Sequence, residues 1–95
     1  MITRIVKVKL KSEHVEEFNA FMETFTKTTK EFKNNHHVDY FADMDEPSNF
    51  HIYTIWKTEG ALSKFRNSDL NKDFIQRIVD WSSAKHSAWT VQNMQ

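Results

Sequence analysis

The spacing of apolar residues changes along the chain, and the order of these changes constrains the fold more than any other sequence feature. From Ile2 to Leu10 apolar and polar residues alternate, which predicts a strand. From Val15 to Phe32 apolar residues recur every three or four positions, which predicts an amphipathic helix with Ser12 as its N-cap. Alternation returns from His36 to Asp43 and from Phe50 to Lys57, on either side of a polar turn, so these segments predict a hairpin.

The second half of the chain completes a known order of elements. Thr58 is the predicted N-cap of a short helix, and either Ser68 or Asp69 begins a second helix, whose apolar residues extend to Trp81. Ala88 to Gln92 is the predicted last strand. Strand, helix, strand, strand, helix pair and strand is the order of the ferredoxin-like α+β fold, a four-stranded antiparallel sheet with helices on one face. All 95 residues are expected to form one domain.

The third predicted strand is apolar on both faces. Ile52 and Trp56 point to one face, while His51, Tyr53 and Ile55 point to the other. The helices can cover only one face, and the simplest cover for the other is the same sheet of a second copy. We therefore predict a homodimer closed sheet to sheet, with the second group at the interface.

Composition excludes several classes of function. Thirteen basic residues balance thirteen acidic ones, so a nucleic-acid partner is not expected. There is no cysteine for thiol catalysis or zinc binding, and the lone Gly60 cannot build a phosphate loop. No apolar stretch approaches the ~20 residues that cross a bilayer, and the start lacks a signal-peptide pattern. We expect no membrane partner and a cytoplasmic location.

The stretch W-K-T-E-G-A-L-S-K-F-R-N-S-D-L, Trp56 to Leu70, resembles the signature of the antibiotic biosynthesis monooxygenase (ABM) domain family. The run from His36 to Asp43 and the closing A-W-T-V, Ala88 to Val91, fit the family in the same order. The resemblance implies a dimeric α/β barrel, in agreement with the two apolar faces of the third strand. It also implies an activity, because some members oxidise phenols or quinols with O2 and no cofactor, and others degrade haem.

The chain departs from both active branches of this family. Trp56 matches a strand-end tryptophan of the quinone-forming branch, but Ile52 and Leu62 stand where that branch has an asparagine and a tyrosine. Phe65 stands where the haem-degrading branch has a tryptophan, and Ile75 replaces its haem-ligating histidine. The resemblance therefore implies the fold without most of the polar residues of either branch, and we expect no cofactor and no metal.

An enzyme of this type would hold a small aromatic molecule, a phenol or quinol, between sheet and helices. The predicted pocket walls are Trp56, Phe65, Ile52, Thr54, Ile78, Phe21, Phe25 and Arg66. Arg66 would hold an anionic substituent, although a solvated charge on the helix surface is the favoured interpretation of this residue. The deprotonated substrate would give an electron to O2, so neither metal nor flavin would be required.

The predicted catalytic base is a histidine at the start of the second strand. His36 and His37 are adjacent and so point to opposite faces. One hairpin register places His36 beside Trp56, and a slip by one residue places His37 there. We favour the first because it also pairs apolar residues with each other. Such a histidine could accept a phenolic proton, whereas the alternative is a strand-end histidine half in water.

Other functions fit the same pattern. The chain could be a non-catalytic dimeric barrel that binds a small molecule or serves a structural purpose, in which Trp56 only packs the sheet against the helices. An RNA-recognition module shares the element order, but this chain lacks the glycines and basic surface such modules use. His14 and His86 are interpreted as surface residues.

Overall fold

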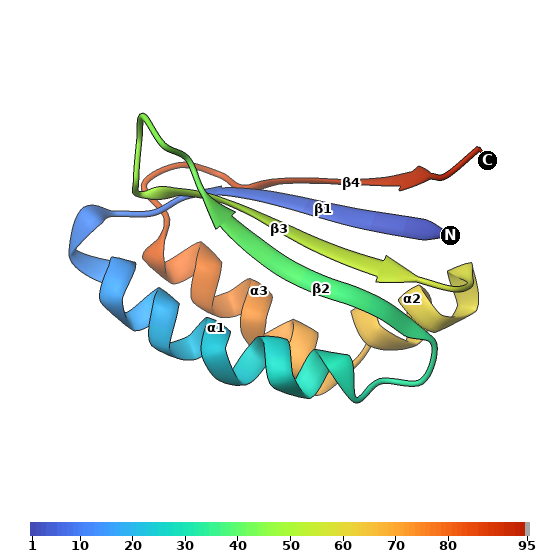
Figure 1. Cartoon of the computed structure of the whole chain (residues 1–95). Helices are drawn as coiled ribbons and strands as arrows, with labels where there is room; N and C mark the ends of the chain where they lie inside the picture. Colours follow the sequence, from blue (N-terminus) through green and yellow to red (C-terminus); the bar gives the residue numbers. More distant parts are fainter. Residues whose placement is uncertain (95) are drawn as a thin grey trace.

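The computed structural model describes residues 1–94 and has the predicted order of elements (Figure 1). The elements are β1 (Ile2–Lys9), α1 (Val15–Lys30), β2 (Asn35–Ala42), β3 (Asn49–Trp56), α2 (Glu59–Arg66), α3 (Asp69–Trp81) and β4 (Ser87–Gln92). The sheet has the strand order β2-β3-β1-β4, and all neighbouring strands are antiparallel. This is the ferredoxin-like α+β fold, as predicted.

The two shorter helices begin with side-chain caps, at Thr58 as predicted and at Ser68, one of the two predicted starts. The Thr58 hydroxyl oxygen accepts a hydrogen bond from the Ala61 N–H at 3.1 Å, and this bond caps α2. The Ser68 hydroxyl oxygen accepts one from the Asn71 N–H at 3.2 Å, and this bond caps α3. Each cap satisfies a backbone donor that has no partner within the helix. α2 ends at Arg66 and α3 begins at Asp69, so the two are separate helices.

The predicted N-cap of the first helix was wrong. Ser12 begins a single 3₁₀ turn, Ser12–His14, and α1 itself begins at Val15. The Ser12 carbonyl, rather than its hydroxyl, accepts the bond, from the Val15 N–H. A 3₁₀ turn at a helix start uses this tighter hydrogen bond to satisfy the first free amides.

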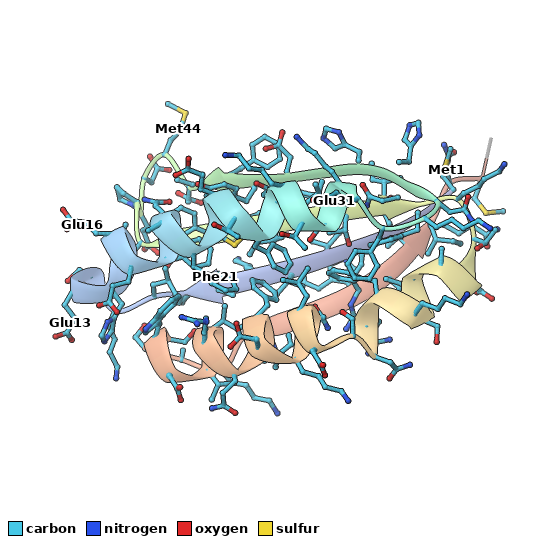
Figure 2. The ribbon with its side chains drawn as sticks, turned by 90° about the horizontal axis from the view of Figure 1, so that it is seen from below. Met1, Glu13, Glu16, Phe21, Glu31 and Met44 are labelled. Carbon is cyan, nitrogen blue, oxygen red and sulfur yellow. The ribbon has the colours of Figure 1, made fainter. Side chains whose placement is uncertain are left out.

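The three helices lie on one face of the sheet (Figure 1), and the core between them and the sheet is rich in aromatic rings. Phe25 of α1 stacks on Phe74 of α3 with ring centroids 4.5 Å apart. Figure 2 shows Phe21 between α1 and α3, and its ring also stacks on Phe74, at 6.3 Å. Trp56, at the end of β3, is fully buried and its ring lies 4.9 Å from that of Phe65 on α2. The aromatic surplus of the sequence therefore forms the core of this small domain.

No helix covers the opposite face of the sheet, which we call the outer face (Figure 1). Its apolar side chains are partly open to solvent: Phe41 is 51% exposed, Trp89 43% and Val91 42%. Every residue of β4 is exposed. His51, Tyr53 and Ile55 lie on this face as predicted, because they alternate with the buried residues of β3. Within residues 1–94 no helix is long and apolar enough to cross a membrane.

The β2–β3 hairpin has the favoured register over most of its length. The observed partners are Ala42 with Phe50, Tyr40 with Ile52 and Val38 with Thr54. This register was chosen because it places apolar residues opposite each other on the helix-covered face. Tyr40 and Phe50 indeed pack there, with ring centroids 6.1 Å apart.

The register shifts at the start of β2, and this shift corrects the prediction for the two histidines. A β-bulge makes Asn35, and not His36, the partner of Trp56, while His37 pairs with Ile55. The Asn35 side-chain amide donates to the carbonyls of His37, at 3.3 Å, and Ile55, at 3.4 Å, and so holds the bulge closed. His36 is the inserted residue of this bulge, so it has no cross-strand partner, and its side chain is exposed. Neither predicted histidine therefore lies beside Trp56.

The acidic turn between β2 and β3 is organised by one carboxylate. Asp43 accepts hydrogen bonds from the N–H groups of Asp45, at 2.8 Å, and Glu46, at 3.0 Å. These two bonds favour the ionised form and lower the pKa of Asp43 below its ordinary value. Among residues 1–94 no three histidine or carboxylate side chains are placed to hold a metal ion together.

Candidate functional site

A cavity of about 420 Å³ opens between the helix-covered face of the sheet and the helices. Its apolar lining comes from β1, β3 and all three helices: Val6, Phe25, Ile52, Phe65, Phe74 and Ile75. Its polar lining consists of Arg4, Thr54, Arg66, Asn71, Lys72, Gln76 and His86. Aromatic walls with a few polar groups are typical of small-molecule sites, and the volume lies in the usual range of ~300–1,000 Å³.

Arg4 is the charged residue that the sheet itself places at this cavity. It interrupts the apolar face of β1, between Ile2 and Val6, and pairs with Thr54 on β3 and Thr90 on β4. Its guanidinium donates to the Thr90 hydroxyl at 3.0 Å. Partial burial, and then the positive charge of Arg66, lower the pKa of Arg4. The positive charges of Arg4 and Arg66 therefore repel each other at the edge of this cavity.

Thr54 lines the cavity and has a buried hydroxyl without a hydrogen-bond partner in the described part of the chain. The residue is 3% exposed, and its oxygen has no hydrogen-bond partner within residues 1–94. A buried polar group without a partner costs about 1–3 kcal/mol. A ligand in the cavity that bonded to this hydroxyl would recover that free energy.

The structure brings five of the eight predicted wall residues together. Ile52, Thr54, Phe25, Phe65 and Arg66 all line the cavity. Their assignment followed from the alternation of β3 and from the apolar faces of α1 and α2. These five residues therefore line one cavity between the sheet and the helices.

The other three predicted wall residues are core residues outside the cavity. The Trp56 ring lies between Phe65, at 4.9 Å, and Phe32, at 6.2 Å, so it packs beneath α2. Ile78 is fully buried, and Phe21 stacks on the far side of the Phe25–Phe74 pair. A pattern of apolar spacing cannot distinguish such residues, which pack against the core, from residues that line a cavity.

Neither histidine proposed as a base reaches this cavity. His36 is exposed in the bulge of β2. His37 lies on the outer face, where its Nε2 is 3.7 Å from a carboxylate oxygen of Asp39. The bulge makes Asn35 the partner of Trp56, so the predicted place of a histidine beside Trp56 was wrong.

His86 is the histidine that lines the cavity, and sequence reasoning missed it. It lies in the connection between α3 and β4, next to the first residue of β4. Its interpretation as a surface residue is therefore corrected, because its side chain is half-buried at the cavity. Arg4 did carry a signal, since a charge within the apolar face of a strand is unusual.

Ile75 lines the cavity at the position where the resemblance places a haem-ligating histidine in other members. An isoleucine side chain offers no ligand atom to iron. Titration of the purified protein with haemin is therefore expected to give no stoichiometric Soret band of a histidine-ligated haem. A defined Soret band that is lost in His86→Ala would contradict this prediction, because another histidine would then ligate the iron.

The outer face carries a second, shallower hollow of about 470 Å³. His37, Asp39 and Phe41 of β2 and His51, Tyr53 and Ile55 of β3 form most of its lining. The Phe41 and Tyr53 rings meet edge to face with centroids 5.6 Å apart. This hollow is open and is separated from the first cavity by the sheet.

Comparisons with known proteins agree with this architecture. The family model described as antibiotic biosynthesis monooxygenase matches residues 1–77. A crystal structure of an antibiotic biosynthesis monooxygenase superposes with a TM-score of 0.90 at 15% identity, covering 100% of both chains. A conserved protein from Methanosarcina mazei Go1 superposes with a TM-score of 0.89 at 19% identity, covering 98% of this chain and 93% of that one. Rv0793 from Mycobacterium tuberculosis gives 0.89 at 10% identity, covering 99% and 95%. No curated protein matches the sequence at a significant level.

Proposed function

Because the chain belongs to the antibiotic biosynthesis monooxygenase family, we propose that it is a cofactor-independent oxygenase of a small phenol or quinol. The observation that carries this proposal is the cavity between sheet and helices, which combines aromatic walls with one histidine. Phe25, Phe65 and Phe74 provide flat apolar surfaces suited to a ring.

Within this proposal His86 takes the role of the base. A phenol reacts slowly with O2 until it loses its proton, because the phenolate gives up an electron far more readily. Histidine is the side chain that changes charge near neutral pH, and His86 is the histidine of the cavity lining. For an anthrone-type substrate, O2 supplies both the oxidant and the new oxygen: a ring CH2 becomes a carbonyl, and the second oxygen atom leaves as water.

Oxygen uptake by purified, chelator-treated protein tests the proposal. A panel of hydroquinones, naphthols and anthrones is added, and uptake is compared with that of the same mixture without protein. Uptake above this control with at least one compound, unchanged by added metal or flavin, is expected. Uptake at the control rate for the whole panel would contradict the proposal.

A second function is a non-catalytic barrel that binds a small aromatic molecule. Ile52 and Leu62 favour it, since they stand where the resemblance places polar groups of the quinone-forming branch. Ile52 lines the cavity and Leu62 is buried, so neither brings a polar atom to a ligand. Saturable binding of panel compounds without oxygen uptake would identify this function.

We also propose that the working form is a homodimer joined through the outer face. The exposed Phe41, Trp89 and Val91 lie on this face, next to the half-buried Tyr53 and Ile55. A contiguous apolar surface of this kind on a small domain favours burial against a partner. A two-fold axis would place the same residues of both copies against each other.

Light scattering at micromolar concentration is expected to give a mass of about 23 kDa, because isologous pairing doubles the 11.4 kDa chain. Ile55→Asp is expected to give the monomer, since it would bury an unpaired charge in the interface. Val79→Asp is the matched control, because Val79 is an exposed apolar residue of α3 on the other side of the molecule. A monomeric parent protein, or an Ile55→Asp variant that remains dimeric, would contradict the prediction.

A further inference from the structure

The charges around the cavity are all of one sign. Arg4, Arg66 and Lys72 line it, and no aspartate or glutamate does. This contrasts with the chain as a whole, in which thirteen acidic residues balance thirteen basic ones. The positive charge is therefore a property of this site and not of the protein.

The arginines of the cavity differ from the third arginine in their partners. Arg77 pairs with the Asp73 carboxylate at 3.0 Å. Within residues 1–94, neither Arg4 nor Arg66 lies within ion-pair distance of an acidic group. Arg4 is also partly removed from water, and the charge of Arg66 acts on it unfavourably. An anion between the two guanidinium groups would offset both effects.

Thr54 provides an independent observation at the same place. It sits directly opposite Arg4 across the β1–β3 pair, on the face that the helices cover. Its hydroxyl is buried and unpartnered and can donate to an oxygen anion. The Thr54 hydroxyl as a hydrogen-bond donor and the Arg4 guanidinium as a cation therefore both favour a ligand with a negatively charged oxygen.

We propose that the ligand of this cavity is a ring compound with a negatively charged oxygen-rich group, bound by Arg4 and Arg66 together with the Thr54 hydroxyl. The rings of Phe25, Phe65 and Phe74 contact its apolar body. The inference rests on the proposed function only in using the same cavity, since it names the class of compound and not the reaction. Guanidinium groups match the geometry of carboxylates and phosphates, and both are such groups.

Isothermal titration calorimetry at pH about 8, where the acids are ionised, compares three probes of one ring size. They are 2-naphthoate, 2-naphthyl phosphate and the neutral 2-naphthamide. At least one anion is expected to bind about tenfold tighter than the amide, because hydrogen bonds to charged groups are the stronger ones. The anion that binds more tightly shows whether the cavity prefers a carboxylate or a phosphate. Raising sodium chloride from about 50 to about 500 mM should lower the affinity for the two anions and leave that for the amide unchanged.

Two substitutions locate the effect. Arg66→Gln and Arg4→Gln are each expected to lower the affinity for the bound anion about tenfold and to change the affinity for the amide by less than about twofold. Arg77→Gln is the matched control, because it removes the one arginine outside the cavity lining and should change neither. Arg66 is exposed, so its variant is expected to fold even where the Arg4 variant does not.

Equal affinity for the anions and the amide would overturn the inference, as would anion affinity that survives both cavity variants. Absence of binding by all three probes up to millimolar concentration would overturn it as well. None of these measurements needs O2 or turnover. A protein that binds naphthoate through Arg66 but takes up no oxygen above the control with any hydroquinone, naphthol or anthrone of the panel would support the inference while contradicting the oxygenase proposal.

Discussion

Trp56→Ala is expected to lower the free energy of unfolding by about 3–5 kcal/mol, the usual cost of truncating a fully buried aromatic ring. Trp56 is 0% exposed and packs against Phe65 and Phe32 at the end of the central strand β3. Removing its indole leaves a void that these rings cannot close without shifting α2. A domain of this size is stable by about 5–15 kcal/mol, so the change removes a large part of the total.

Urea unfolding followed by circular dichroism measures this change, with Val79→Ala as control. Val79 is exposed on α3, and its truncation is expected to cost less than about 0.5 kcal/mol. Measurement at one protein concentration for all variants keeps any contribution from dimerisation constant. A Trp56→Ala variant within about 1 kcal/mol of the parent would mean that the void collapses, contrary to the packing described here.

His86→Ala is expected to lower the rate of oxygen uptake by about 100-fold or more, in line with the loss of a general base. His86 lies in the connection before β4, so its replacement leaves the core rings untouched.

His36→Ala and His37→Ala are the matched controls for that experiment. His36 is exposed in the β-bulge, and His37 lies on the outer face beside Asp39. Both variants are expected to retain the parent rate to within about twofold, because neither side chain reaches the cavity. Oxygen uptake that survives His86→Ala but is lost in His37→Ala would place the chemistry on the outer face and contradict the site described here.

The register of the β2–β3 hairpin was predicted correctly over most of its length but not at the start of β2. Apolar matching between strands predicted the partners of Ala42, Tyr40 and Val38 correctly. The same reasoning failed a few residues further on, where the Asn35 amide holds a bulge that shifts the register. The bulge depends on hydrogen bonds to a carbonyl of the neighbouring strand, and a period of two contains no information about them.

The sequence by itself determined the order of elements, the face that each strand buries and the aromatic character of the core, because these depend on local spacing and capping. Only the tertiary structure decided which polar groups meet. Arg4, Thr54 and Thr90 form one row across three strands, and His86 joins them from the connection before β4. These residues are up to 86 positions apart, as the bond between Arg4 and Thr90 shows. Strand pairing over such separations is fixed by the packing of the whole sheet against its helices, so no local pattern records it.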